Sequence, residues 1–482
     1  MADAVSTLSI AMAVVLGGVL LLWVLHFRSY CRHRTSKSGA SLPKGSFGWP
    51  VIGESLDFAR NPGTYASSHY ERYGSIFKSC LFLRRAILGT TPDFAKFVTS
   101  NSHLFQMDAP ANSKRLGPKA FVFKDGPQHM SVKKTLQKAL LPESLQSRVE
   151  VLENIVLQNL ASWEQSGTVM ASIATQKITT ETAAYILFGV PYICSTPHGR
   201  FAVENLKTMS EGQFAVPFNL PGTALWKALT AKEVLMSYLK ELVEARRRGE
   251  NHQNDSLGAL LAAKNDPEAL PEVKDLDDES LLENLVGMWI GASETTAVTL
   301  TWTLKFLEDH PNICLRVQAE QQEILKNKDY SMDGPRLTWE DTRKMVYTQK
   351  FFKELQRIVS IGAIAPRKAT QDVEYKGTLI PKGWAVYPMY NFIHLDPGIH
   401  PDPLSFNPDR FNAQPKPFTY LPFSSGSHMC PGVELAKLVS LIYIHHLTTT
   451  FKFEKATADQ GVEYRPFPAP IGGYPVHIHR QN

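Results

Sequence analysis

The chain has 482 residues, of which 43% are hydrophobic and 20% are charged. These proportions are typical of globular proteins and exclude a mainly disordered, collagenous or polytopic membrane protein. Lys and Arg total 51 against 46 Asp and Glu. The resulting net charge of +5 is too small over this length to indicate nucleic-acid binding.

The first predicted element is an N-terminal membrane anchor. Residues 8–27 contain no Asp, Glu, Lys or Arg, and twenty helical residues at about 1.5 Å each span a hydrocarbon core of roughly 30 Å. A cleaved signal peptide is the alternative, but the apolar run is longer than usual and no small-residue cleavage site follows it. Arg28, Arg32 and Arg34 come directly after the helix, so we expect the rest of the chain to face the cytosol.

Residues 28–50 are basic and then rich in Pro and Gly, which predicts a stiff, irregular hinge. No internal repeat or second linker follows, so residues 51–482 are expected to form one large domain. The five cysteines are scattered, with no C-x-x-C pair. That pattern is typical of a reducing compartment.

The predicted body is mainly α with a small β region. Helical periodicity is clearest at residues 145–163, 229–248 and 281–307, whereas strand-like runs are short, at 75–88 and 373–380. Asp277 is the expected N-cap of the longest helix, and His310-Pro311 its end.

The middle of that long helix reads Gly-Ala-Ser-Glu-Thr-Thr from Gly291 to Thr296. An acid beside a threonine is costly in an apolar helix unless water or partners satisfy it, and a threonine hydroxyl can divert a helical carbonyl. The alternative interpretation is a Ser/Thr-rich packing segment.

Glu354 and Arg357 are three residues apart and can form an ion pair on one helix face. The pattern is weak by itself, because Glu244 and Arg247 repeat it on a charged helix where a solvated face is expected. Arg410, in the segment Phe-Asn-Pro-Asp-Arg-Phe, follows the first pair further along the chain.

The most informative segment runs from Phe423 to Gly432 and reads Phe-Ser-Ser-Gly-Ser-His-Met-Cys-Pro-Gly. Gly426 and Gly432 permit conformations or close approaches that a Cβ would forbid. A helix is predicted to start near Pro431, and a thiolate just before a helix N-terminus is electrostatically favoured. These features suit an axial ligand of haem, although a buried Cys beside a Gly-rich turn is the alternative.

This segment resembles the cysteine-ligand loop of the cytochromes P-450, and the other motifs occur in that family's order. The resemblance implies the cytochrome P-450 fold and a haem b whose iron is bound by Cys430, with Phe423, Gly426, His428 and Gly432 shaping the loop. It also implies a structural network of Glu354, Arg357 and Arg410. In oxygen activation, Thr295 would hold a water while Glu294 relays protons.

The same resemblance suggests which side chains meet the haem propionates. His129 and Lys133 match an early helix that reaches these carboxylates, Arg367 matches a basic residue after the substrate-lining turn, and His428 stands where many relatives carry Arg. Each of the four could instead be an ordinary surface charge.

Five segments look most like abscisic acid 8'-hydroxylases, within the plant hydroxylases of terpenoid and steroid hormones: 42–50, 219–223, 372–384, 432–437 and 464–470. Departures are Ser424 for a usual Gly, Gly291-Ala292 for Ala-Gly, Lys133 for Arg, and small side chains at residues 360–366. These departures affect the expected substrate rather than haem binding.

The resemblance therefore implies a monooxygenase that uses O2 and electrons from NADPH–cytochrome P-450 reductase, anchored in the endoplasmic reticulum membrane with its catalytic domain in the cytosol. The chain has no G-x-G-x-x-G nucleotide motif of its own, and no nucleic-acid partner is expected. The expected reaction is abscisic acid 8'-hydroxylation. The alternative is hydroxylation of another terpenoid or steroid, such as a brassinosteroid, gibberellin precursor, triterpenoid or taxane-like diterpenoid.

Two other classes are kept as alternatives. A peroxide-rearranging haem-thiolate enzyme needs no reductase, but Glu294-Thr295 counts against it because a peroxide isomerase needs no oxygen protonation. A non-catalytic sterol- or haem-binding membrane protein would bind haem without consuming reductant.

For the substrate, an isoprenoid acid needs apolar walls and a cation for its carboxylate. The resemblance suggests Lys114 or Arg115 as that cation, although both could be solvated loop charges. The expected apolar wall is Ile361, Gly362, Ala363, Ile364 and Ala365.

Overall fold

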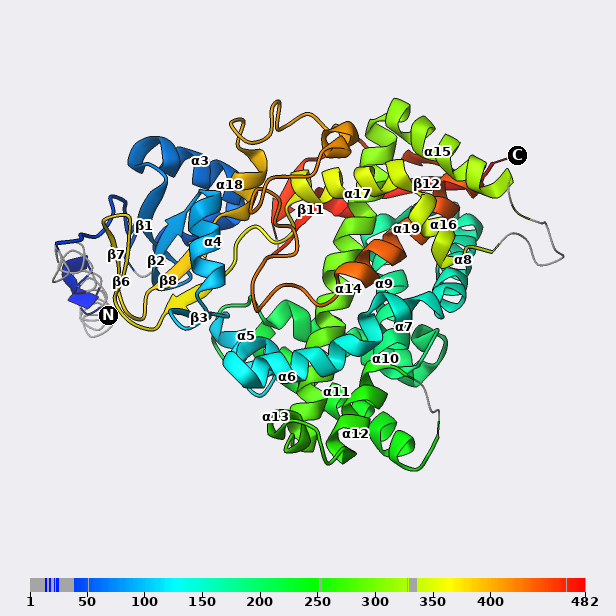
Figure 1. Cartoon of the computed structure of the whole chain (residues 1–482), viewed down its shortest axis with the longest axis horizontal. Helices are drawn as coiled ribbons and strands as arrows, with labels where there is room; N and C mark the ends of the chain where they lie inside the picture. The colour runs from blue at the N-terminus through cyan, green and yellow to red at the C-terminus, as the bar shows by residue number, and fades with distance from the viewer. Residues whose placement is uncertain are drawn as a thin grey trace, which may run out of the picture. The chain divides into compact units, whose positions relative to one another are not determined.

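The computed structural model describes residues 39–50, 52–250, 254–326, 328, 336–464 and 466–481, together with positions 14, 17, 18, 21 and 23–25. This part of the chain is mainly helical with small sheets (Figure 1). Its internal contacts divide the chain into two compact units. The first comprises Met1–Asp108 and Ala363–Ile393, and the second Ala109–Gly362 and His394–Asn482.

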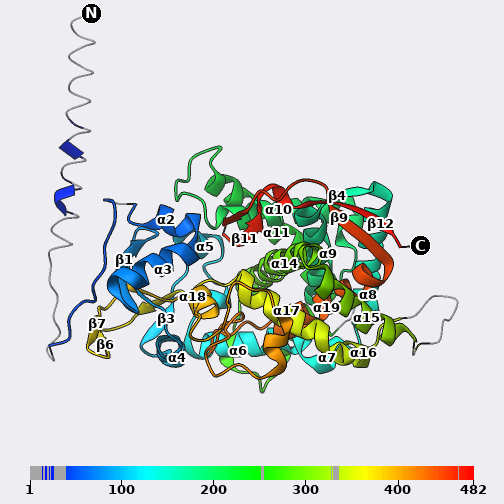
Figure 2. The same ribbon diagram turned by 90° about the horizontal axis from the view of Figure 1, so that it is seen from above.

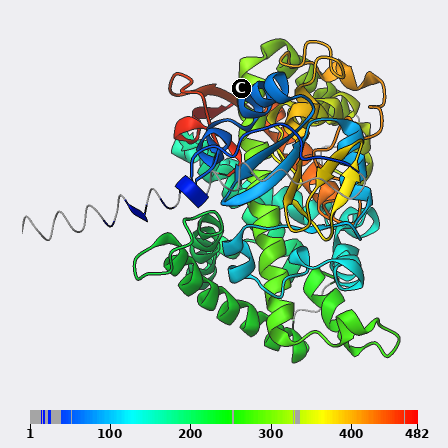
Figure 3. The ribbon, with the colours of Figure 1, turned by 90° about the vertical axis from the view of Figure 1, so that its left-hand side faces the viewer.

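The first unit is built on a five-stranded mixed sheet with the strand order β1-β2-β8-β5-β3. Strand β2 pairs antiparallel with β1 and parallel with β8. Segments far apart in the sequence therefore lie side by side, blue beside yellow in Figure 3. The elements of this unit are α2 (Ser55–Arg60), α3 (Pro62–Tyr73), β1 (Ile76–Leu81), β2 (Arg84–Gly89), α4 (Pro92–Ser100), β3 (Phe105–Met107), β5 (Arg367–Ala369), β6 (Val373–Tyr375), β7 (Thr378–Ile380), β8 (Ala385–Pro388) and the start of α18 (Tyr390–Leu395).

Both strand-like runs predicted from the sequence are hairpins rather than single strands. The run 75–88 turns at Phe82 and Leu83, whose φ angles of 53° and 63° are the left-handed values that a two-residue hairpin turn requires. The run 373–380 turns at Lys376 and Gly377, with φ of 48° and 77°. Sequence alternation predicted the strands but not these turns, and the first turn is hard to predict because Phe and Leu are unusual at positive φ.

The second unit holds most of the helices and two small sheets, of strand order β4-β12-β9 and β10-β11. Its elements are α5 (Ala111–Leu116), η1 (Phe121–Phe123), α6 (Gly126–Gln137), η2 (Lys138–Leu140), α7 (Pro142–Gln146), α8 (Val149–Ser166), β4 (Thr168–Met170), α9 (Ala171–Phe188), η3 (Ile193–Ser195), α10 (Pro197–Gly212), α11 (Ala224–Arg247), α12 (Ser256–Asn265), α13 (Pro271–Lys274), α14 (Asp278–Asp309), α15 (Pro311–Lys326), α16 (Trp339–Lys344), α17 (Val346–Val359), η4 (Pro408–Asn412), α19 (Val433–Thr450), β9 (Phe451–Lys455), β10 (Val462–Tyr464), β11 (Pro468–Pro470), η5 (Ile471–Gly473) and β12 (Pro475–Arg480).

Helix α14 is the predicted long helix and runs through the second unit. Asp277 caps it as expected, because its carboxylate accepts the backbone N–H of Ser280 at 2.7 Å, and the helix ends at Asp309, before Pro311. Helix α9 lies alongside it (Figure 2). The hydroxyl of Thr179 donates to the carbonyl of Ser293 at 2.8 Å, so the two helices are joined by hydrogen bonds as well as by apolar packing.

The other predicted helices differ from the structure at their ends. Helix α11 begins at Ala224, several residues before 229, because the hydroxyl of Thr223 caps it by accepting the N–H of Trp226 at 3.3 Å. The predicted helix 145–163 is divided into α7 and α8, since the chain turns at Ser147 and Arg148. The Arg148 guanidinium packs 5.6 Å from the ring centre of Tyr185, a tertiary contact that sequence periodicity does not contain.

Within the residues that the structure describes, no helix is both long and apolar enough to cross a membrane. The predicted anchor, residues 8–27, lies mostly outside the described residues, as does the first part of the predicted hinge, 28–38.

Candidate functional site

The loop from Phe423 to Gly432 forms a compact turn before α19. The backbone N–H of Cys430 donates to the carbonyl of Phe423 at 2.9 Å, and that of Met429 donates to Gly426 at 3.1 Å. The N–H of Gly432 points at the sulfur of Cys430, with an N···S distance of 3.4 Å. Helix α19 starts at Val433, two residues after the predicted start, so Cys430 precedes its first turn.

Two opposing effects act on the Cys430 thiol. Burial raises its pKa, while the hydrogen bond from the Gly432 N–H and the nearby Lys133 charge favour the thiolate and lower the pKa. A bound cation at the sulfur would add to the second effect, because a metal ligand binds as the thiolate.

Ser424 stands where the family usually has Gly, and its backbone conformation shows why Gly is favoured there. Its φ is 62°, and that of Gly426 is 73°. A side chain at left-handed φ costs roughly 1–2 kcal/mol, whereas glycine adopts this conformation without the penalty. The usual Gly at the position of Ser424 therefore has a backbone reason.

Helix α6 supplies two of the four predicted propionate ligands, and both contact the Cys loop directly. Lys133 donates to the carbonyls of Ser427 at 2.8 Å and Met429 at 2.5 Å. The ring of His129 lies between the carbonyls of Phe121 and Ser427, at 3.0 and 3.1 Å. The structure thus brings these two side chains together at the loop.

His428 joins the same group. Its ring centre is 3.9 Å from that of His129, and its Nε2 is 3.0 Å from a carboxylate oxygen of Asp125. Arg367 belongs to the first unit. There its buried side chain donates to the carbonyl of Pro366 at 2.9 Å, and its predicted contact with a propionate stays a prediction.

Glu354, Arg357 and Arg410 meet in one network. Arg357 binds Glu354 through Nε and Nη2 at 2.7 and 2.8 Å, and both side chains are 0% exposed. The Nε of Arg410 lies 3.4 Å from the same carboxylate, which also accepts the N–H of Asn407 at 2.9 Å. This bidentate pairing and the extra donors are what burial of such charges requires.

The Glu-Thr pair lies in the middle of α14. Glu294 accepts a hydrogen bond from the side-chain amide of Gln176, on α9, at 2.9 Å, and burial raises its pKa. Thr295 donates to the carbonyl of Gly291 at 2.8 Å. Gly291 is exposed although it lies mid-helix, and a Cβ built there would have nothing within 4 Å, so open space adjoins this turn of the helix.

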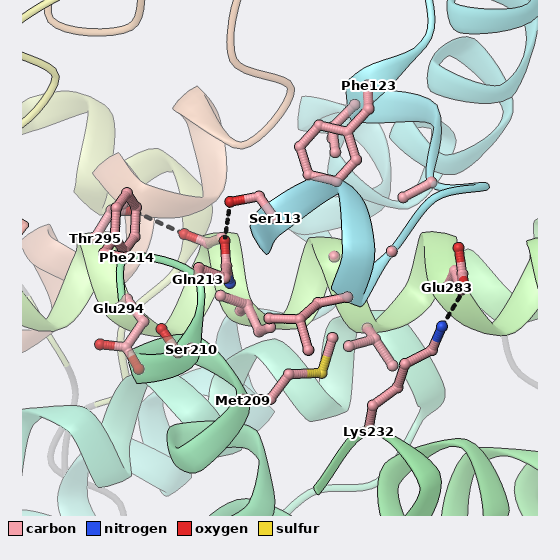
Figure 4. Close-up of a pocket in the computed structure, with 18 of the residues that line it drawn as sticks. Ser113, Phe123, Met209, Ser210, Gln213, Phe214, Lys232, Glu283, Glu294 and Thr295 are labelled. Atoms are coloured by element: carbon pink, nitrogen blue, oxygen red, sulfur yellow. Dashed lines mark hydrogen bonds and ion pairs between the residues drawn. The ribbon is translucent and has the colours of Figure 1, made fainter. Parts of the chain in front are cut away.

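A cavity of about 200 Å³ lies beside this part of α14 (Figure 4). Most of its lining is apolar and comes from α5, α10, α11 and α14, with the segment that follows α5. Its charged lining residues are Lys232, Glu283 and Glu294. Thr295 and Gly291 also line it, so the cavity includes the turn that carries the Glu-Thr pair.

The cavity lining does not include the substrate residues predicted from the sequence. Helix α5 lines the cavity through Ser113 and Leu116, whereas Arg115 on the same helix is exposed and Lys114 is partly exposed. Ile361 and Gly362 belong to the second unit, and residues 363–365 to the first. Contact of any of these with substrate stays a prediction.

Sequence analysis missed Lys232, Glu283 and Gln176. A signal existed for Lys232, because it lies four residues after Ala228 and three before Leu235, both buried. A lysine inside the apolar stripe of a helix is unusual. Glu283 and Gln176 carried no comparable signal, because their partners come from other helices.

The second unit suits a haem with a thiolate ligand. A cysteine sulfur stands before the N-terminus of α19 with a backbone N–H aimed at it, α6 places His129 and Lys133 at the same loop, and open space adjoins Gly291 of α14, against which α19 packs. Fold and loop together define a haem-thiolate protein.

Comparison with known proteins identifies the family. The sequence profile of the cytochrome P-450 family matches residues 43–468. Abscisic acid 8'-hydroxylase 2 of Arabidopsis thaliana is 36% identical, with 95% of this chain and 92% of the relative covered. Abscisic acid 8'-hydroxylase 2 of Oryza sativa subsp. indica is 37% identical, with 92% and 88% covered.

Among solved structures, retinoic acid bound cyanobacterial CYP120A1 is similar to this chain. The TM-score is 0.83 at 28% identity, and the match covers 92% of this chain and all of the other. The chain therefore belongs to the cytochrome P-450 family. It is a monooxygenase, an oxidoreductase whose cofactor is a haem with a cysteine thiolate on the iron.

Proposed function

We propose that this enzyme hydroxylates abscisic acid at C8', with Cys430 as the ligand of the haem iron. The observation that carries the proposal is the similarity to abscisic acid 8'-hydroxylases over more than nine-tenths of the chain. The cavity supports it, because mostly apolar walls and one lysine suit a compact isoprenoid acid.

The haem and the side chains around it would have separate parts in this reaction. The bound haem supplies activation of dioxygen and insertion of one oxygen atom into a C–H bond. Cys430 would hold the iron, and the Gly432 N–H would stabilise the charge on its sulfur. His129, Lys133, His428 and Arg367 would bind the propionates.

Glu294 and Thr295 would deliver protons. A carboxyl with a raised pKa keeps its proton to a higher pH than an exposed glutamate, so Glu294 can act as a donor closer to neutral pH. Thr295 lines the same cavity, where its hydroxyl can position a water. The apolar walls hold the substrate and exclude bulk water.

The electrons would come from a separate reductase, as cytochrome P-450 monooxygenases typically use one. We further propose NADPH–cytochrome P-450 reductase as that partner and residues 8–27 as a single-pass anchor in the endoplasmic reticulum membrane. This arrangement would place the catalytic domain in the cytosol.

The test is reconstitution of the full chain with haem, reductase and lipid. Abscisic acid should produce a substrate-type shift of the haem Soret band, and mass spectrometry should detect a product heavier by one oxygen atom and dependent on NADPH. Di- or triterpenoids and steroids serve as the comparison set. Turnover of these without any shift or product from abscisic acid would replace the proposed substrate by a bulkier terpenoid or steroid.

A further inference from the structure

Lys232 and Glu283 form an ion pair in the wall of the cavity. Lys232 comes from α11 and Glu283 from the first part of α14, and Nζ and Oε1 are 2.5 Å apart. Their side chains are only 16% and 1% exposed. Figure 4 shows the two pointing at each other, on the side of the cavity away from Glu294 and Thr295.

Stability alone is a poor reason for such a pair. Taking two charges out of water costs free energy that their attraction does not reliably repay, and a well-packed apolar pair is often as stable. Glu283 is well satisfied, because its second oxygen accepts the backbone N–H of Lys119 at 2.6 Å. An ammonium has three N–H donors, and the bond to Glu283 uses one of them.

Lys232 is also the one cation among the described residues that line the cavity. The cations proposed from sequence, Lys114 and Arg115, do not belong to that lining, although their neighbours do. An anionic group inside this cavity therefore has one positively charged partner available, and charge-assisted hydrogen bonds are the strongest that a side chain offers.

The position of the pair would orient a bound acid along the cavity. Glu283 and Thr295 are separated by twelve residues of one helix, or about 18 Å. Gly287, Ile290 and Gly291 form the wall between them. A molecule with its acid group at Lys232 would thus lay its hydrocarbon part along this wall toward the Glu-Thr pair.

We propose that Lys232 is the specificity-determining residue for the substrate's carboxylate, and that Glu283 is a positioning residue that holds the ammonium at the cavity. The ligand class is an isoprenoid carboxylic acid, oxidised at the end remote from the acid. This inference deepens the proposed function and rests on it for the choice of abscisic acid as the first ligand.

The experiment measures dissociation constants from the Soret shift of the holoenzyme for abscisic acid and its methyl ester, and for the longer retinoic acid and its methyl ester. In Glu283→Gln the amide oxygen can still accept from the ammonium and hold it in place, but the competing negative charge is gone. Both acids should therefore bind several-fold more tightly, while the esters change little. In the double variant Lys232→Met/Glu283→Gln no unpaired charge is left buried. There the acids should bind about tenfold or more weakly and the esters within about threefold of wild type.

A control comes from the same helix. Lys240 pairs with Glu244 at 3.9 Å on the exposed face, so Lys240→Met/Glu244→Gln removes a similar pair outside the cavity and should leave all four constants unchanged. Lys114→Met tests the rival cation, and a selective loss of acid binding there, with none in the Lys232 variant, would assign the carboxylate to Lys114.

The outcomes separate the two proposals. If abscisic acid gives no shift but retinoic acid binds with the stated dependence on Lys232, the abscisic acid assignment fails and this inference stands. The inference is overturned if acid and ester weaken equally in the double variant, if Glu283→Gln weakens the acids, or if neither acid shifts the wild-type spectrum.

Discussion

The sulfur of Cys430 differs from the other described cysteine sulfurs in its surroundings. Burial raises the pKa of the thiol at Cys80, Cys194 and Cys314, to about 12 for Cys194. Burial raises the pKa of Cys430 as well, and nearby cations oppose that effect at Cys80 and Cys194 as Lys133 does here. Among the described cysteines, however, only at Cys430 does a backbone N–H also favour the thiolate. The sequence predicted that Cys430 precedes a helix N-terminus. It did not predict that the N–H of Gly432 points at the sulfur, because that contact depends on the conformation of the turn.

This difference predicts the result of four single substitutions. Cys430→Ser should abolish the red-shifted Soret band of the reduced carbon monoxide complex, because that band requires a thiolate on the iron. The matched variants Cys80→Ser, Cys194→Ser and Cys314→Ser should keep it. A normal band from the Cys430 variant would remove the ligand assignment.

The Glu-Thr pair predicts a pH effect on coupling, the product formed per NADPH consumed. Because burial raises the pKa of Glu294, its proton is present below that raised value and is lost as the pH rises through it. Wild-type coupling should therefore fall with rising pH. Thr295→Ala should lower coupling about tenfold or more at every pH, with an unchanged carbon monoxide spectrum.

Glu294→Gln is the control for the titrating group. The substitution replaces the carboxyl by an amide of similar size that does not titrate. Coupling should therefore be low and should lack the wild-type pH dependence. A pH profile in this variant that matches wild type would assign the titration to another group, and unchanged coupling in Thr295→Ala would remove its role in proton delivery.

At the residue scale, site residues that share one short sequence motif were predictable, whereas residues that meet only through the packing of two helices were not. Cys430 and the pair Glu354–Arg357 stand in short local motifs, and the structure places the latter two in one bidentate contact. Lys232 and Glu283 meet only because α11 crosses α14. The sequence periodicity of α11 was visible, but the identity of the facing helix was not.

At the scale of elements, long periodic helices were predicted with the correct centres and shifted ends. Asp277 and Pro311 mark α14 because capping and the missing proline N–H act locally. The split between α7 and α8 and the turn at Phe82 and Leu83 depend on tertiary contacts and on backbone conformations that those residues rarely adopt. Local propensity therefore gave the elements but not every boundary.

His394 joins three elements and predicts how stability depends on pH. Its Nδ1 is 2.6 Å from the hydroxyl of Ser360 at the end of α17, and its Nε2 accepts the N–H of Leu421, ahead of the Cys loop, at 2.8 Å. Burial lowers the pKa of His394 to about 3. The neutral ring is the form that can make both bonds.

The free energy of unfolding should rise with pH in the range where the unfolded chain binds more protons than the folded chain. Unfolded histidine has a pKa near 6.5, so between about pH 3 and 6.5 the unfolded chain binds a proton that the folded chain does not. The contribution of neutral His394 to the free energy of unfolding is therefore fully present above about pH 6.5. It is lost as the pH falls, at about 1.4 kcal/mol per pH unit. In His394→Gln, the slope of unfolding free energy against pH, from urea unfolding at pH 4.5 to 6, should decrease by about one proton. An unchanged slope would contradict the assignment.

The predicted anchor makes a prediction for the whole molecule. Deletion of residues 2–27 should move the protein from the membrane pellet to the supernatant after a high-salt wash, because the segment carries the apolar length needed to span a bilayer. The carbon monoxide spectrum should be retained, since the matched family profile begins at residue 43. Retention in the pellet would contradict the role of this segment as an anchor. Loss of the carbon monoxide spectrum would contradict the expectation that the rest of the chain folds and binds haem without it.

The pairing of α9 with α14 has a consequence for motion around the cavity. Hydroxyls of Thr175 and Thr179 donate to α14 carbonyls at 3.2 and 2.8 Å, and the indole of Trp289 donates back to Thr180 at 3.2 Å. Central amides of α14 should thus exchange with deuterium only through global unfolding. The segment 213–223, between α10 and α11, is largely exposed and should exchange much faster. The α14 wall of the cavity should therefore keep its shape, while the part lined by Gln213 and Phe214 should adjust to each ligand.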